Sequence, residues 1–210
     1  MPSSFDVSIF RAVNAFARDT GWLHGPARLF ANDGVVLFAL LLVAAGVLAL
    51  RRGGLVAAVR PVLAGAGVLL AVGVNQPIVH AVGEARPFAV LPQALVLVHR
   101  SVDASFPSDH ATMAGAVAVG LLFVERRWGI IAALLAVLMA VTRVYVGVHF
   151  PSDVLAGLLV GGLVALAVMQ AAPWLERRAP GRRADEQEIV HSDVLTVAGR
   201  QRGDTTQVRE

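Results

Sequence analysis

The sequence TRVYVGVHFPSDVLAGLLVGGLVALAVMQA, residues 142–171, contains the pattern that decides the fold. Its second part, residues 151–171, is almost entirely apolar, and about 20 such residues are enough for a helix to cross a bilayer. Pro151 suits the first turn of a helix, so we expect a transmembrane helix to begin there. The first part ends another apolar run, and polar Arg143 and His149 lie in or beside the short connection between the two.

The same kind of apolar run occurs four more times upstream, at residues 34–50, 61–82, 110–124 and 130–146. Over 210 residues, 56% are hydrophobic, 16% are charged and the mean hydropathy is +0.67, which is unlike an ordinary soluble domain. We therefore expect an all-α fold, a polytopic membrane helix bundle of about five transmembrane helices. Abundant glycine and alanine would let these helices approach closely, although a compositional bias of the genome would give the same abundance.

The two ends of the chain differ from this central part. Five apolar residues near the N-terminus fall close to helical spacing among polar ones, which predicts an interfacial amphipathic helix: Phe5, Ile9, Phe10, Val13 and Phe16. The C-terminal residues are rich in Arg, Asp, Glu, Gln and Gly, which predicts a flexible tail. The expected organisation is an N-terminal interfacial segment at 1–33, a transmembrane catalytic domain at 34–175 and a cytoplasmic tail at 176–210.

The arginines predict which way the helices cross the membrane, because positive residues in short loops stay on the cytoplasmic side. They gather between the first and second runs, between the third and fourth, and after the fifth: Arg51, Arg52, Arg60, Arg126, Arg127, Arg177, Arg178, Arg182 and Arg183. The loops at 83–109 and 147–150 would then be extracytoplasmic. We expect a multi-pass protein of the cell membrane with a cytoplasmic C-terminus.

Composition also excludes some classes of function. The chain has no cysteine, so disulfides and thiolate metal sites are excluded. All 18 basic residues are arginine, and no basic stripe with interleaved aromatic residues indicates nucleic-acid binding. There is no carboxylate pair and no His-x3-His spacing, so the sequence predicts neither a metal site nor a cofactor.

The first chemical motif is Phe106-Pro107-Ser108-Asp109-His110, immediately before the third apolar run. Ser108 is placed to cap this helix, and a helix start with free N–H groups favours anions. A simple N-cap after a proline turn would explain Pro107 and Ser108 equally well. It would not explain His110 at a membrane boundary.

The second chemical motif joins Arg143, His149 and Asp153. Asp153 would lie in the first turn of the last helix and reach back to the His149 ring, fixing its tautomer and leaving one ring nitrogen free as a nucleophile or base. Arg143 could snorkel to lipid headgroups. Guanidinium is also the best bidentate partner of phosphate, and Arg86 follows the same logic on the other predicted outer loop.

Together these motifs resemble the type 2 phosphatidic acid phosphatase superfamily of membrane lipid phosphatases. Its signature is Lys-x6-Arg-Pro, then Pro-Ser-Gly-His, then Ser-Arg-x5-His-x3-Asp. The third part matches at Arg143, His149 and Asp153, with Thr142 in place of serine. The second part matches with Asp109 where glycine is commoner, a variant similar to the undecaprenyl-diphosphatase branch.

The first part of the signature departs from the family, because only Arg86 and Pro87 match it. Val79 stands at the lysine position, and the chain contains no lysine that could replace it. One phosphate contact is therefore missing or supplied by another residue. His80 and Arg100 are candidates by their proximity in sequence.

The resemblance implies a mechanism. His149 would attack the terminal phosphorus with Asp153 orienting its ring, and His110 would protonate the leaving oxygen and later activate water. The residues that would surround the phosphate oxygens are Arg86, Arg143, Ser108 and Asp109, with Thr142, His80 and Arg100 as auxiliary positions. The scheme needs no metal or cofactor. The expected partners are a lipid phosphate or diphosphate and membrane lipids, with the oligomeric state open.

Several functions remain as alternatives at this stage. Undecaprenyl diphosphate is the expected substrate, and phosphatidate or phosphatidylglycerol phosphate are the other candidates. The missing lysine leaves open a catalytically inactive membrane protein that only binds lipid phosphates. A vanadate-dependent oxidase shares the three-part site, but five spans without a large soluble helical body argue against it.

Overall fold

The computed structural model describes residues 2–171 and 173, which form helices joined by loops. The helices are α1 (Ser4–Asp19), η1 (Gly21–Leu23), α2 (His24–Val82), α3 (Pro87–Val90), α4 (Asp109–Val124), α5 (Arg126–Tyr145) and α6 (Pro151–Gln170). No strand occurs among the described residues, so the predicted all-α class is confirmed. The predicted tail at 176–210 lies outside the described residues, and the boundaries of the three predicted domains stay predictions.

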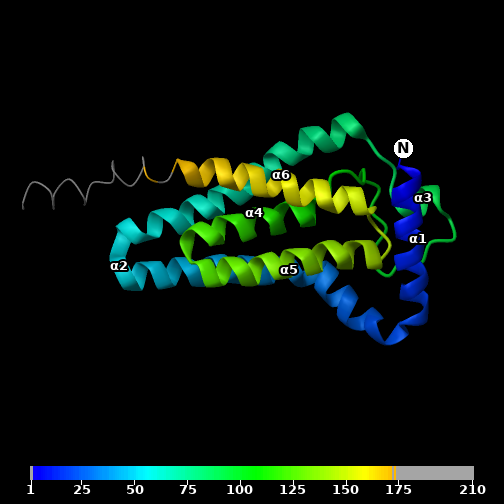
Figure 1. Ribbon diagram of the computed structural model, residues 1–210, viewed down its shortest axis with the longest axis horizontal. Helices are drawn as coiled ribbons and strands as arrows, with labels where there is room; N and C mark the ends of the chain where they lie inside the picture. Colours follow the sequence, from blue (N-terminus) through cyan, green and yellow to red (C-terminus); the bar gives the residue numbers. More distant parts are fainter. Residues whose placement is uncertain (1, 172, 174–210) are drawn as a thin grey trace, which may run out of the picture. The chain divides into compact units, whose positions relative to one another are not determined.

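Helix α2 is two antiparallel limbs rather than one rod. Gly53 and Gly54 leave helical geometry, and Gly54 has a φ of 62°, a left-handed conformation that glycine adopts without steric cost. The limbs, residues 24–52 and 55–82, run out and back beside the other helices (Figure 1). They contain the first two predicted spans but extend beyond both. The apolar run predicts only the part of a helix that faces lipid, whereas the helix itself continues until the backbone turns.

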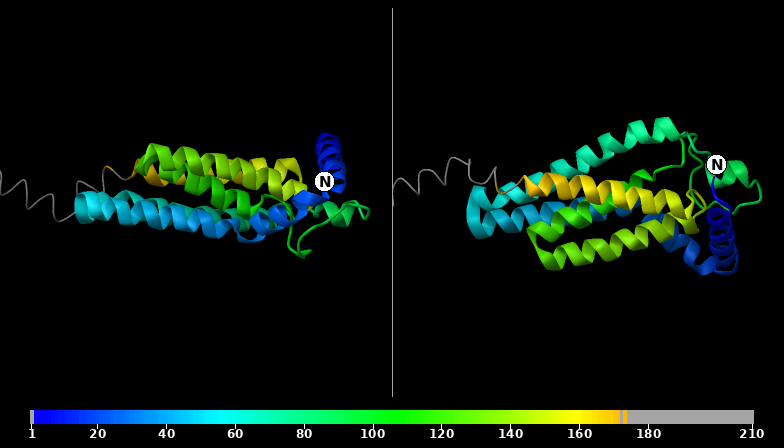
Figure 2. Two further views of the ribbon diagram at one scale, coloured as in Figure 1. Left: turned by 90° about the horizontal axis from the view of Figure 1, so that it is seen from below. Right: turned by 45° about the horizontal axis from the view of Figure 1, so that its top comes forward.

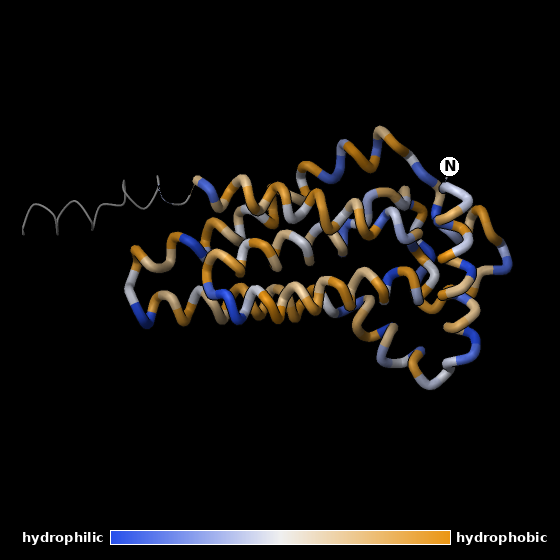
Figure 3. Tube along the Cα trace, in the orientation of Figure 1, coloured by the Kyte–Doolittle hydropathy of each residue, from blue (hydrophilic) through white to orange (hydrophobic). Residues whose placement is uncertain are grey.

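The other three spans are close to their predicted bounds. Helix α5 begins at Arg126, four residues before the predicted span, and α6 matches the predicted start at Pro151. Three helical segments of the described chain are long and apolar enough to cross a membrane: Gly21–Val90, Arg126–Tyr145 and Pro151–Gln170. The first of them holds both limbs of α2, whereas α4 is apolar but has only 16 residues. Hydrophobic positions follow the helices, and hydrophilic ones gather toward their ends (Figure 3).

Helix α4 is the centre of the bundle and packs against α2, α5 and α6. Its backbone lies close to that of α6, which is possible because Gly157 and Gly161 have no side chain. A Cβ on Gly161 would lie 1.9 Å from the Thr112 carbonyl oxygen, and one on Gly157 would lie 2.6 Å from the Ser108 carbonyl oxygen. Small residues allow such backbone contact in lipid, where no hydrophobic force draws helices together. Other glycines, such as Gly65, have nothing within 4 Å, so close packing accounts for only part of the abundance.

Helix α1 lies across one end of the bundle, at the same end as α3 and the loop before α4 (Figures 1 and 2). It is amphipathic as predicted, with Phe10 buried against Phe150 and Phe5 exposed. Asn14 binds the backbone of Leu95 through both its amide nitrogen and its oxygen, at 2.8 and 2.9 Å. Residues 24–33, at the end of the predicted N-terminal segment, form the beginning of α2.

Candidate active site

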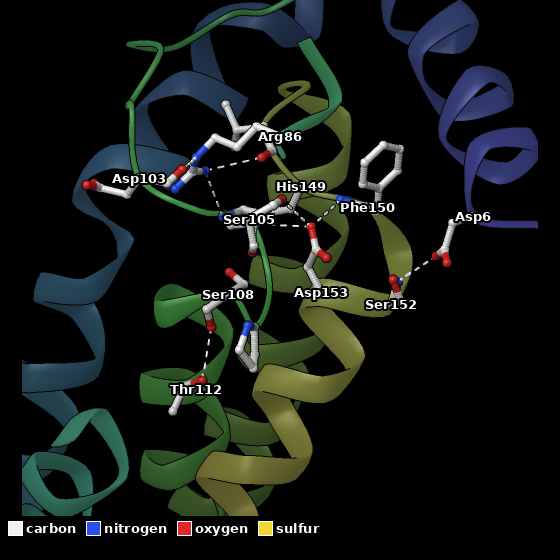
Figure 4. A network of polar contacts seen from close by, with 12 residues as sticks. Asp6, Arg86, Asp103, Ser105, Ser108, Thr112, His149, Phe150, Ser152 and Asp153 are labelled. Carbon is white, nitrogen blue, oxygen red and sulfur yellow. Dashed lines mark hydrogen bonds and ion pairs between the residues drawn. The ribbon is translucent and has the colours of Figure 1, made fainter. Parts of the chain in front are cut away.

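All three sequence motifs lie at the end of the bundle that α1 covers. Arg86 precedes α3, Ser108 precedes α4, Arg143 is in the last turn of α5, and His149 and Asp153 flank the start of α6. The Ser108 amide donates a hydrogen bond to the Asp153 carbonyl oxygen at 3.0 Å, which ties the beginnings of α4 and α6 together. Figure 4 shows the polar network that results.

The His149 ring is 3% exposed and held from both sides. Its Nδ1 lies 2.9 Å from the Ser105 carbonyl oxygen, and because a carbonyl only accepts, Nδ1 carries the proton. Its Nε2 lies 3.3 Å from Nη1 of Arg86, which only donates, so Nε2 carries a lone pair. Both contacts select the same tautomer, with Nε2 free to attack an electrophile.

The electrostatic surroundings keep this ring neutral. Burial lowers the pKa of His149 well below its ordinary value, and the cations of Arg143 and Arg86 lower it further. The hydrogen bond to the Ser105 carbonyl acts in the opposite direction and is the smallest of these effects. A neutral imidazole is the form that a nucleophile requires.

Asp153 is fully buried beside His149. Its Oδ2 accepts hydrogen bonds from the Phe150 amide, at 2.7 Å, and from the Ser105 hydroxyl, and it lies 3.4 Å from His149 Nδ1. Asp153 therefore lies beside the ring as predicted, at 3.4 Å from Nδ1 of a neutral imidazole. The shorter bond to Nδ1 comes from Ser105, a residue that the sequence analysis missed because a loop position has no periodic pattern to reveal its burial.

Arg86 is fixed by the loops around it. Its Nε donates to the Asp103 carbonyl oxygen at 2.9 Å, and its Nη1 donates to the Val148 carbonyl oxygen at 3.2 Å. Burial lowers the pKa of Arg86 while the carboxylate of Asp103 raises it, and a guanidinium stays charged at any ordinary pH. Arg86 thus places a fixed positive charge directly at the reactive nitrogen of His149.

Two buried groups that can donate a hydrogen bond, Arg143 Nε and Ser108 Oγ, lack a partner among the described residues. Arg143 is 8% exposed, and its Nη1 donates to the Ala31 carbonyl oxygen at 3.1 Å. Ser108 is the N-cap residue of α4 as predicted, but its side chain makes no capping hydrogen bond. Buried donors without partners are rare and costly, so these two are suited to an anionic ligand.

The remaining predicted site residues have other surroundings. His110, in the first turn of α4, is half-buried, and its neighbours include the cations of Arg143 and Arg86 and the imidazole of His149. Asp109 Oδ1 accepts hydrogen bonds from Asn75 and Gln76 of α2, at 2.7 and 2.9 Å. These two bonds link α4 to the second limb of α2, a role that its position within the motif did not indicate.

The auxiliary candidates have surroundings of other kinds. The Thr142 hydroxyl donates to the Leu138 carbonyl oxygen of its own helix, at 2.7 Å. His80 is exposed on α2, and Val79, at the family's lysine position, is 7% exposed. Arg100 stacks over the Phe88 ring at 5.5 Å and lines a cavity of about 490 Å³ together with Arg86.

Comparison with known proteins identifies the family. The family model of the PAP2 superfamily matches residues 60–177. The chain belongs to the PAP2 superfamily. It is 34% identical to the Escherichia coli protein YbjG over 170 residues, which are 80% of this chain and 82% of YbjG. It is 30% identical to the undecaprenyl-diphosphatase BcrC of Bacillus subtilis over 156 residues, 74% of this chain and 78% of BcrC.

Solved structures of the PAP2 superfamily share the fold. The phosphatidylglycerolphosphate phosphatase of Bacillus subtilis superimposes with a TM-score of 0.56 at 24% identity, covering 79% of this chain and 83% of that one.

A shorter sequence match, to the bacitracin transport permease protein BcrC of Bacillus licheniformis, is 38% identical over 90 residues, 43% of this chain and 44% of that protein. With its apolar helices and these relatives, the chain is a membrane lipid phosphatase of the PAP2 superfamily.

Proposed function

We propose that this PAP2 phosphatase hydrolyses undecaprenyl diphosphate to undecaprenyl phosphate and inorganic phosphate through a phosphohistidine at His149. The observation that carries the proposal is the lone pair on His149 Nε2, which faces the fixed cation of Arg86. The unpartnered Arg143 Nε and Ser108 Oγ supply two further donors for phosphate oxygens. Such preformed charge is what phosphoryl transfer needs, since positioning and electrostatics supply most of its catalysis.

In the first step, His149 Nε2 attacks the terminal phosphorus, and the bond from phosphorus to the bridging oxygen breaks. The leaving lipid phosphate takes a proton from His110. The negative charge of the bound diphosphate offsets Arg86 and Arg143 and so favours the imidazolium form of His110 that this step uses. This attack follows substrate binding, when Arg86 moves its hydrogen bond from Nε2 to a phosphate oxygen and so frees the lone pair.

In the second step, His110 accepts a proton from water while the water oxygen attacks the phosphorus of phosphohistidine. The P–N bond breaks, inorganic phosphate leaves, and His149 recovers its lone pair. Asp153 stabilises the ring while it is positively charged, because Oδ2 lies 3.4 Å from Nδ1. The two histidines alternate in protonation, so the rate should follow a bell-shaped dependence on pH.

The placement of arginines supports an extracytoplasmic site. Arg51, Arg52, Arg126 and Arg127 belong to the end of the bundle opposite His149, and the positive-inside rule assigns that end to the cytoplasm. The lipid carrier would then enter from the outer leaflet with its diphosphate at the bundle end. The proposal of undecaprenyl diphosphate is supported by the similarity to the undecaprenyl-diphosphatase BcrC of Bacillus subtilis and by the Asp109 variant of the second motif.

A second candidate function is lipid-phosphate binding without turnover. The observation that favours it is Val79, which leaves an apolar, buried side chain at the family's lysine position. The two candidates differ in one measurable respect, since the binding protein would retain the diphosphate unchanged.

The test is phosphate release from undecaprenyl diphosphate by the purified protein in detergent with EDTA, beside His149→Ala. We expect turnover in the wild type and none in the variant, while His99→Ala, an exposed histidine of the loop before α4, keeps full activity. Phosphatidate and phosphatidylglycerol phosphate belong in the same assay. Turnover of these glycerolipids alone would reject the proposed substrate, and binding without any turnover would favour the second candidate.

A further inference from the structure

Ser105 contacts His149 and Asp153 with different groups, although no sequence motif includes it. Its carbonyl oxygen accepts from His149 Nδ1 at 2.9 Å, its hydroxyl donates to Asp153 Oδ2, and the hydroxyl also lies 3.4 Å from Nδ1. Resting on the function proposed above, we propose that Ser105 is a positioning residue that sets both the ring of the nucleophile and the carboxylate behind it. Figure 4 shows Ser105 beside these two side chains.

The geometry of the carboxylate indicates what the hydroxyl does. Asp153 Oδ2 accepts hydrogen bonds from the Ser105 hydroxyl and the Phe150 amide and lies 3.4 Å from His149 Nδ1, while Oδ1 has no partner among the described residues. Only two hydrogen bonds therefore fix the rotation of this buried group, and one of them is the Ser105 hydroxyl. Without that bond the carboxylate can turn Oδ1 toward Nδ1 and compete with the Ser105 carbonyl for its proton.

The two contacts of Nδ1 then have separate roles in the reaction. In the resting site the proton points to the neutral Ser105 carbonyl, which is nearer than the carboxylate by 2.9 against 3.4 Å. When Nε2 bonds to phosphorus the ring becomes positive, and its attraction to the carboxylate increases. An interaction that strengthens only as charge develops accelerates the chemical step rather than binding.

The backbone of Ser105 connects this pair to the phosphate-binding arginine. Its amide donates to the Glu84 carbonyl oxygen at 2.7 Å, two residues before Arg86. Ser105 itself is 0% exposed, so the loop before α4 is held firmly where it passes the ring. One residue thus couples the loop carrying Arg86, the nucleophile and the first turn of α6.

The direct test is Ser105→Ala in the undecaprenyl diphosphate assay. Loss of one hydrogen bond to a charged group should lower kcat by about 10- to 100-fold with KM little changed. The matched control is Ser8→Ala, which removes an exposed hydroxyl of α1 bonded to the Ser4 carbonyl oxygen, and it should leave kcat unchanged. An unchanged kcat in Ser105→Ala, or a rise in KM alone, would overturn the proposal.

A double-mutant cycle with Asp153→Asn shows whether Ser105 acts through Asp153. If it does, adding Ser105→Ala to Asp153→Asn should cost far less than the single change costs in the wild type. Equal costs in both backgrounds would mean that the hydroxyl acts independently of the carboxylate, which contradicts the proposal.

A readout without substrate separates this inference from the proposed function. The ¹⁵N chemical shifts of the His149 ring report the hydrogen bonding of Nδ1 in the resting protein. Ser105→Ala should change the Nδ1 shift, whereas Ser8→Ala should not. The proposal fails if both variants keep the wild-type spectrum, whether or not undecaprenyl diphosphate proves to be the substrate.

Discussion

The two ends of the helix bundle both contain arginines and carboxylates, but they use them differently. At the end that carries His149, Arg86 and Asp153 are held by backbone groups of several loops, and Asp153 is fully buried. At the opposite end, Arg52 pairs with Glu125 at 3.5 Å, and their side chains are 65% and 37% exposed. Burial and fixed hydrogen bonds, rather than residue type, therefore distinguish the charges proposed to be catalytic from the exposed ones at the opposite end.

The largest difference should come from the same substitution at both ends. Arg86→Lys keeps the charge but loses the planar fork that reaches Val148, Asp103 and the substrate phosphate, so turnover should fall by about 100-fold or more. Arg52→Lys should change turnover by less than about 2-fold, because exposed ion pairs contribute little. Similar effects at the two ends, measured as kcat/KM, would remove the distinction.

The second-largest effect should come from the packing of α4 against α6, between the two ends of the bundle. Gly161→Ala would place a Cβ 1.9 Å from the Thr112 carbonyl oxygen, so α4 and α6 must separate, at a cost of about 1–3 kcal/mol of unfolding free energy. The matched control is Gly65→Ala, which has nothing within 4 Å and should be neutral or slightly stabilising. Thermal denaturation in detergent measures both, and equal midpoints would mean that α4 and α6 are not in backbone contact.

The pKa of His149 distinguishes the two ends of the bundle by a smaller effect. Because burial and two arginines lower its pKa, the ring should remain neutral as the pH falls through 6.5, with the proton on Nδ1. Arg86→Gln removes one cation, so the pKa of His149 should rise toward 6.5, while Arg52→Gln should leave it unchanged. A ¹⁵N titration of the ring is the measurement, and a wild-type midpoint at or above 6.5 would contradict this description of the site.

The smallest effect should come from the contact between α1 and the catalytic end. Asp6 Oδ1 accepts from the Ser152 amide at 2.9 Å, which places a negative charge at the N-terminus of α6. Asp6→Asn should lower the unfolding free energy by about 1 kcal/mol, since a charge at a helix end contributes about that amount. Asp33→Asn, at an exposed position of α2, is the control. An effect no larger than that of the control would show that α1 does not support α6.

Much of this architecture was predictable because it depends on patterns that extend over many residues. Apolar runs predicted the helices, and the start of α6 at Pro151 followed from the proline and the run after it. The motifs could be assigned to one end of the bundle because each lies in or beside a loop between two helices. In a chain of antiparallel helices, every second loop lies at the same end of the bundle. Helix lengths were less accurate, since His24 begins α2 ten residues before the apolar run.

The parts that the sequence did not predict depend on single contacts in loops. Ser105 and Asp6 are buried through residues far along the chain, 44 and 146 positions away, and no local pattern encodes such contacts. The position of Ser108 as the N-cap residue of α4 was predicted, but the orientation of its hydroxyl was not, because the local sequence does not show which way the side chain turns. Asp109 likewise matched a motif while its hydrogen bonds go to α2.

The most direct test of the central claim is to trap the phosphoenzyme. The purified protein is mixed with undecaprenyl diphosphate labelled at the terminal phosphorus, quenched in alkali, where phosphohistidine survives, and digested for mass spectrometry. The structure predicts phosphate on Nε2 of His149, and no label on that peptide in His149→Ala. Label on His110 instead, or turnover that continues in His149→Ala, would contradict the account.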